Sequence, residues 1–588
     1  MKCALRAFVF LLFVASSCQA SSRLEFDWGL AVLNIGTSED ARQEQLAVRN
    51  ALLILGIPFV VTNDVDAATR RAVVIVGGIL FNTELTPPER ESLYAYVEQG
   101  GILFATQVKG NMFFPLFGLH AATASRTNFR LHFSDTREPV LRYLDHPSER
   151  TVSLGDPELY SETIWTTEYS PGPQTSVLAR YENGTVAFTR YGYGRGVAYA
   201  LGPGFKETTF IPQIARSYEA ARRWINSFEP SGDVFRLLLR GLYEDRVHPF
   251  LLVHTIPDGK KTAIVLSHDV DARESFRNSL DFAKMEDSLG VRSTFFVTTK
   301  YFSDDTDIDY YTAESVDWLK KVKNMGFEIA SHSVSHSLEF DKFPVGSTEV
   351  NRSNYQPDQP TLFGEARVSK QLLDQDLQLN VNGFRAGYLR FPSELLRILE
   401  ETGYRYDSSV SAQYVLTNYP YFGFRRRSLE ATQSNIVVVP VTLDDSREFL
   451  TAETQEDVLR TWTEIVSANA DNGAITCLLI HPTDITYKLE TERRFIEENL
   501  NEMTWIGDVG SIAQFWHDRN GLHPVVNEGK DGDPVIVLNM KLADIPPGQS
   551  LVVERVPGVK MPKIMDADGM SVLVKARERE DRFVLLLP

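Results

Sequence analysis

Two aspartates stand at the end of a run of apolar residues. Asp269 and Asp271 follow the segment 262–267, which is nearly unbroken in its apolar character. If this segment is a strand, side chains two residues apart point the same way, so the two carboxylates share one face at its carboxyl end. Carboxylates this close repel each other unless a cation or an arginine lies nearby. A solvated loop would account for the acids, but not for the apolar run before them.

A pair of histidines follows a second strand-like segment. The segment 326–331 runs directly into His332, and His336 lies four residues further on. Two imidazoles at this spacing can converge on one cation from a helical turn. Together with Asp271 they supply two nitrogen ligands and one oxygen ligand, and leave positions open for water and substrate. This is the ligand set of a catalytic metal site rather than a closed structural one.

Two more polar residues follow strand-like segments later in the chain. Arg385 lies within 383–388, and His481 follows the apolar segment 475–480. An arginine close to the two acids would hold a carboxylate ionised and oriented. A surface arginine and a hydrogen-bonded structural histidine are the alternatives. A histidine at the end of a third strand favours a catalytic role.

The order of these motifs resembles that of polysaccharide deacetylases of carbohydrate esterase family 4, also called the NodB homology domain. The resemblance includes five separate motifs. It implies that Asp269 is the catalytic base. It also assigns Asp271, His332 and His336 as ligands of a metal ion, which is Zn²⁺ or another divalent transition metal.

The chain departs from the usual family pattern in two places. Val270 separates the two acids, as in an HDVD-type subgroup, whereas most members have adjacent acids. Gly387 stands two residues after Arg385, where the family usually has a proline. The resemblance still implies that Arg385 pairs with Asp269, and that the backbone N–H of Tyr388 stabilises an oxyanion.

The last two motifs of the family concern a general acid. His481 matches the family's general acid. Asp407 matches the acid that orients this histidine, although Asp444 and Asp445 compete for the role. The implied reaction is hydrolysis of an acetamide on a sugar, with base catalysis on water and protonation of the departing amine.

The resemblance implies an N-acetylated glycan as substrate, such as peptidoglycan or another N-acetylglucosamine polymer. The aromatic residues and arginines between Tyr414 and Arg427 could contact such a polymer, but an ordinary packed loop is equally consistent with them. One alternative function is a non-catalytic glycan-binding or scaffold protein of the cell envelope. Another is an amidase or esterase that acts on a substrate other than a sugar.

The expected strands and helices that position these motifs alternate along residues 259–518. This alternation predicts a distorted (β/α) barrel. Helical stretches at 312–325 and 365–379 alternate with the strands, and 503–516 predicts a final strand and helix. Each motif then lies at or just beyond the carboxyl end of a strand. Active sites of barrels lie at that end.

A separate α/β domain is predicted for residues 24–212. The apolar run 72–78 ends in glycines, as a strand buried on both faces does. A helix follows at 88–98, and Gly100 and Gly101 stop it before the strand 102–105. Strand, helix and strand within so short a stretch indicate a βαβ unit of a parallel sheet.

This N-terminal part is similar to the flavodoxin-like fold of class I glutamine amidotransferase-related domains. Catalytic members of that family need a cysteine on a turn between a strand and a helix. Residues 21–476 contain no cysteine. A non-catalytic structural or binding role is therefore favoured.

The whole chain is predicted to be an α/β multidomain protein, because 588 residues are too many for one hydrophobic core. Residues 213–258 are expected to form a helical linker. Residues 525–588 are expected to form a small antiparallel β-domain that binds carbohydrate or simply packs on the rest. Its predicted strands are 535–538, 551–553, 571–574 and 583–587.

The first twenty residues have the pattern of a secretory signal peptide. Lys2 and Arg6 precede an apolar run at 7–15, and small residues follow up to Ala20. A less favoured alternative is a lipid anchor at Cys18. Either pattern indicates export to the periplasm, the cell envelope or the medium. The apolar run is too short for a membrane span, and no later stretch is long enough.

Charge and cysteine content limit the partners further. The formal net charge is -18. So acidic a chain repels nucleic acid, which is not an expected partner. After the signal peptide only Cys477 remains, so no intramolecular disulfide is expected.

Overall fold

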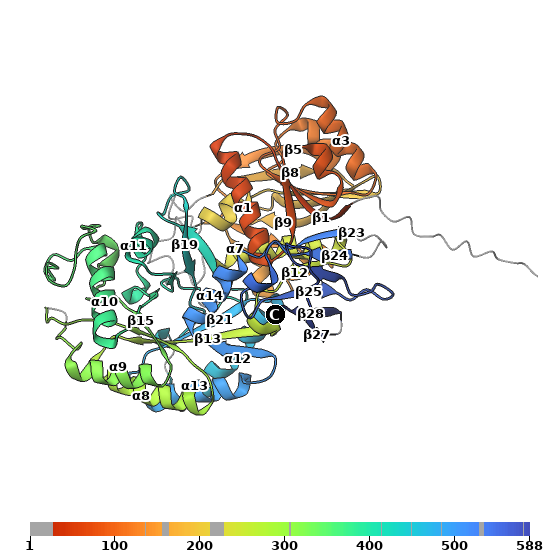
Figure 1. The fold of residues 1–588 in the computed structure, drawn as a ribbon. Coiled ribbons are helices and arrows are strands. Elements are labelled where there is room, and N and C mark those ends of the chain that lie inside the picture. Colours follow the sequence, from red (N-terminus) through yellow and green to blue (C-terminus); the bar gives the residue numbers. More distant parts are fainter. Residues whose placement is uncertain are drawn as a thin grey trace, which may run out of the picture.

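The computed structural model describes most of the chain beyond its first 26 residues. The expected signal peptide at 1–20 and Cys18 lie outside the described residues, and so does the start of the expected linker, 213–228. Figure 1 shows an N-terminal α/β part, a barrel, and β-sheets from the C-terminal part. The described residues are 27–135, 137–155, 164–211, 229–304, 307–412, 414–447, 450–483, 485–528, 534–579 and 581–588.

An eleven-stranded sheet forms the N-terminal part. Five of its strands are parallel and follow the order β2-β1-β3-β4-β11, which is the strand order of flavodoxin-type sheets. The side chains of Val73 to Val76 in β3 are fully buried. The parallel strands are β1 (Asp27–Asn34), β2 (Phe59–Thr62), β3 (Arg71–Gly77), β4 (Ile102–Thr106) and β11 (Gly196–Leu201).

Helices cover both faces of these parallel strands, which is why the strands are apolar throughout. Helices α1 and α7 pack on one face, and α2, α3 and α4 on the other. The Ser38 hydroxyl caps the start of α1, and Gly56 ends this helix with φ 71°. The helices are α1 (Glu39–Leu55), α2 (Val65–Ala68), α3 (Pro87–Glu98), α4 (Phe114–Phe117) and α7 (Glu229–Arg246).

The same sheet continues in strands that the sequence did not predict. Strand β10 pairs antiparallel with β11, and β9, β6 and β7 extend the sheet from there. Buried and exposed residues alternate in β6, as expected when one face meets solvent. These strands are β5 (Leu119–Ser125), β6 (Arg130–Phe133), β7 (Thr151–Ser153), β8 (Thr166–Pro171), β9 (Ser176–Tyr181) and β10 (Val186–Tyr193).

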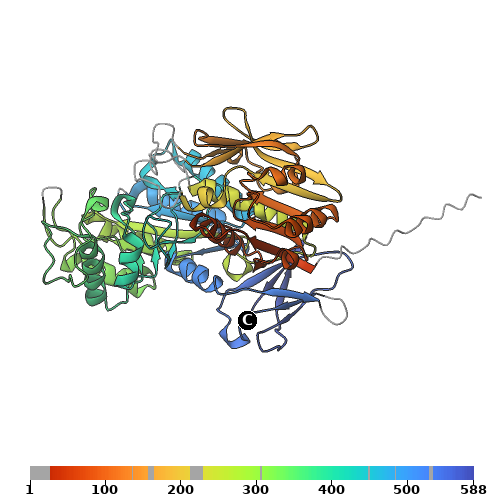
Figure 2. The ribbon, with the colours of Figure 1, turned by 90° about the horizontal axis from the view of Figure 1, so that it is seen from above.

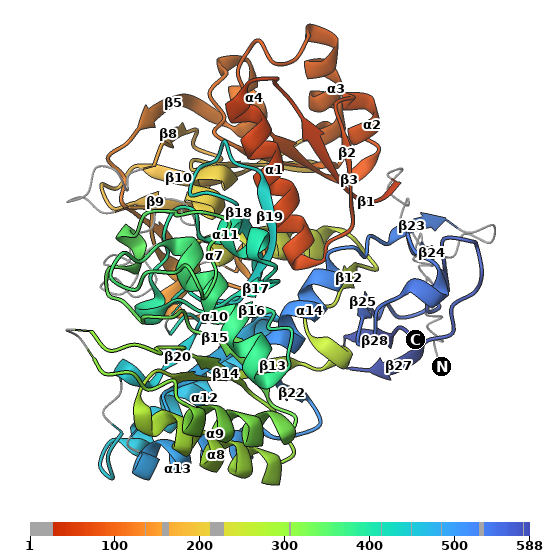
Figure 3. The ribbon, with the colours of Figure 1, turned by 60° about the vertical axis from the view of Figure 1, so that its left-hand side comes forward.

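The central part is a curled sheet that is parallel except for β18, consistent with the distorted barrel that the sequence predicts. Its strands follow the order β18-β19-β17-β16-β15-β14-β13-β21-β20, and β22 pairs with β13. Figure 3 labels these strands except β21. The strands are β13 (Thr262–Val270), β14 (Thr294–Val297), β15 (Glu328–Ser331), β16 (Gly383–Phe384), β17 (Tyr406–Asp407), β18 (Tyr421–Phe424), β19 (Gln433–Val438), β20 (Leu443–Asp444), β21 (Ile475–Ile480) and β22 (Thr504–Gly507).

The two ends of this curled sheet are joined by one chain segment. Strand β19 pairs with β17, and β20 pairs with β21. The residues between them continue both ladders: the Val441 N–H donates to Val410, and the Thr442 N–H donates to Cys477. The segment from β19 to β20 therefore bends between two short strands, and this bend closes the barrel.

Helices surround the barrel strands (Figure 1). The expected helix at 312–325 is α9, and the one at 365–379 is α10, which starts three residues earlier than expected. Among the described helices, none combines the length and the apolar character that a membrane span requires. The barrel helices are α8 (Arg273–Ser288), α9 (Ala313–Asn324), α10 (Leu362–Leu377), α11 (Leu395–Thr402), α12 (Gln455–Asn472), α13 (Ile485–Asn499) and α14 (Val509–Arg519).

The C-terminal part differs from the expected antiparallel domain. It contributes to two sheets, and β24 pairs parallel with β26 in the smaller one. Residues 571–574 form only an isolated bridge, at Ser571, while the strand lies at 575–578. The strands are β23 (Val525–Glu528), β24 (Pro534–Val537), β25 (Ser550–Glu554), β26 (Lys563–Met565), β27 (Lys575–Glu578) and β28 (Arg582–Leu586).

The segment 213–258, expected to be a linker, takes part in two of these units. Helix α7 packs on the N-terminal sheet, and β12 (Leu251–Val253) pairs with β25 as the edge strand of the larger C-terminal sheet. Seen from above, the C-terminal strands lie beside the N-terminal sheet (Figure 2). This segment therefore connects the three parts rather than merely spacing them.

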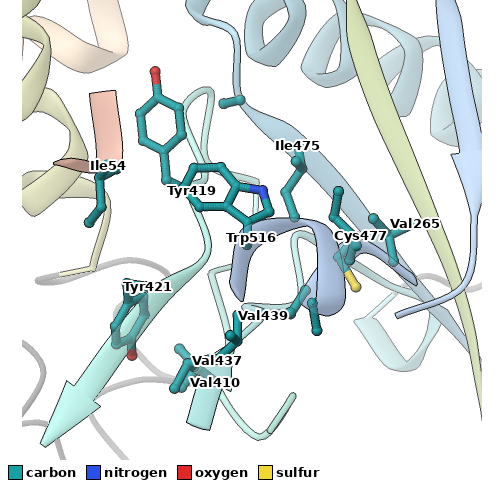
Figure 4. Close-up of a cluster of buried hydrophobic side chains, with 14 of the residues drawn as sticks. Ile54, Val265, Val410, Tyr419, Tyr421, Val437, Val439, Ile475, Cys477 and Trp516 are labelled. Carbon is teal, nitrogen blue, oxygen red and sulfur yellow. The ribbon is translucent and has the colours of Figure 1, made fainter. Parts of the chain in front are cut away.

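One hydrophobic core runs from the N-terminal sheet into the barrel. Figure 4 shows part of it, with Tyr419 and Trp516 side by side and Ile54 of α1 near Tyr419. The rings of Tyr419 and Trp516 are 6.2 Å apart. Tyr419 and Tyr421 are buried, as is Phe424, which packs against Phe210 of the N-terminal part. These aromatic rings thus serve packing between the parts rather than an open sugar-binding surface.

Candidate active site

The deepest element of the candidate site is an ion pair between Arg385 and Asp269. Arg385 Nη1 donates to Asp269 Oδ1 at 2.7 Å, and both side chains are buried. Strand β13 ends at Val270, and Arg385 directly follows β16. The carboxyl ends of these two strands therefore bring the acid and the arginine together, as the sequence predicted.

The remaining donors of Arg385 also have partners. Nη2 donates to the hydroxyls of Ser267 and Ser408, each at 2.9 Å, and Nε donates to the Ser408 carbonyl at 3.2 Å. The guanidinium lies over the Phe296 ring, 4.1 Å from its centroid. A fully buried guanidinium needs such partners because an unpaired buried charge is costly. Arg385 is thus held in one position.

Three side chains next to this pair could hold a metal ion. Ligand atoms of Asp271, His332 and His336 lie within 4.8 Å of one another. His336 Nε2 is 3.5 Å from Asp271 Oδ2. His332 Nδ1 donates to the Arg385 carbonyl at 2.8 Å, which leaves Nε2 as the unprotonated nitrogen. Two imidazole nitrogens and one carboxylate oxygen fit a divalent transition metal with open positions.

The two histidines reach this position from a loop rather than from the expected helical turn. Ser333 and His336 have left-handed backbone conformations, with φ 68° and 52°. Glu365 of α10 supports the loop: its carboxylate accepts the N–H groups of Val334 and Ser335 at 2.9 and 2.8 Å. The sequence did not predict this role of Glu365, because nothing local links this helix residue to the loop.

Gly387 allows the next loop to approach the second histidine. A Cβ atom at Gly387 would lie 2.6 Å from Cδ2 of His336 and 3.1 Å from its Cα. Tyr388 follows with φ 53°, and its ring lies against the His336 ring, with centroids 4.4 Å apart. Tyr388 is partly exposed beside the three ligands. Glycine at position 387 thus has a local steric reason.

His481 lies on the other side of Asp271. Its Nε2 is 3.8 Å from Asp271 Oδ2, and its Nδ1 donates to Asp445 Oδ1 at 2.7 Å. The second oxygen of Asp445 is 2.7 Å from Lys488 Nζ. The acid that orients His481 is therefore Asp445, which follows β20 beside β21, and not Asp407. Asp445 was the competing candidate, and Lys488 was not expected.

Asp407 has a different structural role. Its carboxylate accepts the Ser409 hydroxyl at 2.6 Å and the Ser409 N–H at 3.0 Å. The Ser409 oxygen in turn accepts the N–H of Ala386 at 2.8 Å. Asp407 thus positions the backbone next to Arg385. Asp444, the other competitor, accepts the Ser446 hydroxyl and N–H.

The surroundings of Asp269 and His481 shift the pKa values of these two side chains in opposite directions. Burial by itself would raise the pKa of Asp269, but Arg385, His332 and His481 lower it to about 2. Burial by itself would lower the pKa of His481, but Asp445, Asp271 and Asp269 raise it to about 10. Burial also raises the pKa of Asp271 and lowers that of His336. The arrangement keeps Asp269 ionised and His481 protonated.

A second polar group lies behind Asp269, between β13 and the surrounding helices. His268 Nδ1 donates to the Ile480 carbonyl, at 3.2 Å, and its Nε2 is 3.2 Å from Glu286. Burial would lower the pKa of His268, but Glu492 and Glu286 raise it to about 9. His268, the residue before Asp269, is thus hydrogen-bonded to Ile480, the residue before His481. The sequence did not predict this role of His268, because the residue follows an apolar run.

Comparison with known proteins found structural likeness to the barrel part. A protein from Mycobacterium smegmatis described as a polysaccharide deacetylase is 19% identical, with 45% of this chain and 93% of that chain covered and a TM-score of 0.34. A family 4 carbohydrate esterase from Streptomyces lividans, solved with acetate, is 12% identical (42% and 93% covered, TM-score 0.27). A family 4 pseudoenzyme from Bacillus anthracis is 14% identical (43% and 66% covered, TM-score 0.28).

A search of curated proteins gave no match to this chain. One family model does match, and the matched segment carries the acidic pair, the two histidines and the arginine. Residues 257–406 match the polysaccharide deacetylase family.

Proposed function

We propose that this chain is a metal-dependent hydrolase that removes N-acetyl groups from a polysaccharide, such as peptidoglycan or another N-acetylglucosamine polymer. The observation that carries the proposal is the buried pair of Asp269 and Arg385 beside three convergent metal-binding side chains. The match to the polysaccharide deacetylase family supports the same type of reaction.

Asp269 is the proposed base. Its Oδ1 is occupied by Arg385, and its Oδ2 lies 3.4 Å from His332 Nε2, on the side of the metal-binding residues. A divalent ion held by these residues would polarise the acetyl carbonyl and make a neighbouring water more acidic. Asp269 accepts the proton of that water, and Arg385 keeps the carboxylate ionised until it does.

His481 is the proposed general acid. Asp445 accepts its Nδ1–H and so leaves Nε2 facing the reaction space with a proton to donate. This proton goes to the departing amine of the sugar. The backbone N–H of Tyr388 is the proposed donor to the oxyanion of the tetrahedral intermediate.

The other parts of the chain have supporting roles in this proposal. The leader-like pattern at 1–20 supports export, so the protein would meet its glycan outside the cytoplasm. The N-terminal sheet is a non-catalytic part, because residues 21–476 offer no cysteine nucleophile.

The test combines metal analysis with acetate release from chitin oligomers, peptidoglycan and poly-N-acetylglucosamine. Asp269→Asn should abolish acetate release and keep the bound metal. The exposed Asp457→Asn on α12 serves as control and should behave like the wild type.

Each other outcome points to a different function. Full activity in Asp269→Asn contradicts the proposed mechanism. Bound metal without acetate from any glycan indicates an amidase or esterase on another substrate. A wild-type protein that binds no metal indicates a glycan-binding or scaffold protein.

A further inference from the structure

A cavity lies where the three parts of the chain meet. Its volume is about 330 Å³. Its wall includes Leu55 of α1, Arg240 of α7 and Val552 of β25. The barrel contributes Lys261, just before β13, and Gly473, just before β21. The cavity is therefore at the amino ends of these strands, whereas Asp269 and His481 lie at their carboxyl ends. It is a separate site.

Basic side chains dominate this wall although the chain as a whole is acidic, with a net charge of -18. The two acids of the wall are each already paired: Asp471 with Lys261 at 2.8 Å, and Asp581 with Arg582 at 2.6 Å. Arg240 is paired as well, with Glu244 of the same helix at 2.9 Å, which leaves Arg579 as the one basic group of the wall without an acidic partner among the described residues. The basic residues of the wall are Arg240, Lys261, Arg579 and Arg582.

Arg579 has no acidic partner within this arrangement. Its Nη2 donates to the Gly259 carbonyl at 2.9 Å, and no carboxylate of the described residues lies within ion-pair distance of it. Burial, together with the neighbouring cations Arg582 and Arg577, lowers the pKa of Arg579. A guanidinium held among other cations is a position that an anion would stabilise.

A second buried arginine lies directly behind the wall. Arg519 donates only to carbonyl groups, those of Leu53, Val253 and His254, at 3.0, 3.0 and 2.8 Å. Burial lowers its pKa to about 9. Val253 and His254 themselves line the cavity. The positive charge of Arg519 therefore adds to that of the cavity wall, since its hydrogen bonds go to carbonyl groups and not to a carboxylate.

His254 also lines the cavity and lies among the same positive charges. Burial and the cations Arg579, Arg519 and Arg240 lower its pKa to about 3. Its Nδ1 accepts the Ile256 N–H at 2.9 Å, so the neutral ring carries its proton on Nε2. A neutral imidazole offers a hydrogen-bond donor to a ligand and adds no negative charge.

We propose that this cavity binds a small molecule through a phosphate or carboxylate group held by Arg579, with Arg240, which is already paired with Glu244, as a weaker second contact. Arginine is suited to this role because its planar fork matches the geometry of both anions. The bound anion connects α7, the amino end of the barrel and the C-terminal sheet. It therefore stabilises the junction of the three parts, independently of the proposed deacetylase reaction.

The test is thermal unfolding of the full chain in increasing inorganic phosphate, with chloride at matched ionic strength as reference. Glucuronate in a parallel titration represents the carboxylate source. We expect a saturable rise of Tm with at least one of the two probes, because a ligand that binds only the folded state stabilises it. The probe that acts identifies the source. A rise with neither overturns the proposal.

Variants show whether the effect comes from this cavity. Arg579→Gln should weaken the apparent affinity at least about tenfold, and Arg579→Lys less. Without the anion, Arg579→Gln should unfold at the same Tm as the wild type or higher, since it removes an unpaired cation. Lys261→Gln tests whether the lysine of the cavity wall also contributes to the affinity for the anion. The matched control is Arg460→Gln, an exposed arginine of α12.

Two results would contradict the proposal. One is an equal rise of Tm in the wild type, in Arg579→Gln and in Arg460→Gln, which would mean a general salt effect. The other is loss of the anion effect when a chelator removes any bound metal, which would place the anion at the candidate metal site instead. Because Asp269→Asn should bind the anion normally, failure of the deacetylase proposal leaves this test unaffected.

Discussion

His481 Nδ1 and Asp445 Oδ1 are 2.7 Å apart, and the same carboxylate also accepts the backbone N–H of His481. The acid comes from the end of β20 and the histidine from the end of β21, two paired parallel strands. The pairing of these strands, and not a nearby motif in the chain, gives the histidine its orientation and its proton.

Removal of this carboxylate should weaken the general acid. In Asp445→Asn the pKa of His481 falls, because the acid that raises it is gone. A general acid must be protonated, so the basic limb of the rate profile moves to lower pH, and kcat falls about 100-fold or more. The measurement is kcat against pH. The exposed Asp457→Asn is the control. An unchanged basic limb in Asp445→Asn would mean that another residue donates the proton.

The buried arginine should matter for folding as well as for catalysis. Arg385→Met leaves Asp269 as an unpaired buried charge, and we expect a loss of about 3–5 kcal/mol in the free energy of unfolding, measured with urea. Adding Asp269→Asn should recover part of that loss, since it removes the unpaired charge. Exposed Arg460→Met should change little. If the double variant is less stable than Arg385→Met, the unpaired charge of Asp269 is not the cause of the lost stability.

The space at Gly387 should control metal affinity. Gly387→Ala places a methyl group 2.6 Å from Cδ2 of His336, so this ring must shift away from the other two ligands. We expect metal affinity to fall about tenfold or more, measured by competition with a chelator. Gly192→Ala is the matched control, because a Cβ there meets nothing within 4 Å. Equal affinities in the two variants would show that the loop can yield.

A buried acid at the junction should make stability depend on pH. Burial raises the pKa of Glu149 to about 7, and Thr417 of the barrel donates to it at 2.7 Å. The folded state therefore favours the neutral acid. Stability should fall as pH rises from about 4.5 through about 7, by up to about 3 kcal/mol.

Glu149→Gln should remove this part of the pH dependence and be more stable than the wild type at pH 8. Its amide can still accept the Thr417 hydroxyl. Unfolding by urea at pH 5 and pH 8 in both proteins provides the measurement. The same loss of stability between the two pH values in both proteins would contradict the assignment.

The sequence predicted those features that depend on short stretches of chain. The apolar run before Asp269 predicted β13, and the run before His481 predicted β21, because a strand buried on both faces must be apolar throughout. Parallel strands bring their carboxyl ends to one edge, so the acids, the histidines and Arg385 were expected to meet. The structure places them together.

Contacts between distant segments could not be predicted in this way. Nothing near Asp445 distinguishes it from Asp407, since each lies at the carboxyl end of a short strand. Only the order of β17, β20 and β21 decides which one reaches His481. Glu365 supports the histidine loop from a helix about thirty residues later, at a distance that no local pattern encodes. The sequence alone determined the candidate chemistry and its strands. The tertiary structure decided the partners, because pairing between strands and packing of helices bring together residues that are remote in the chain.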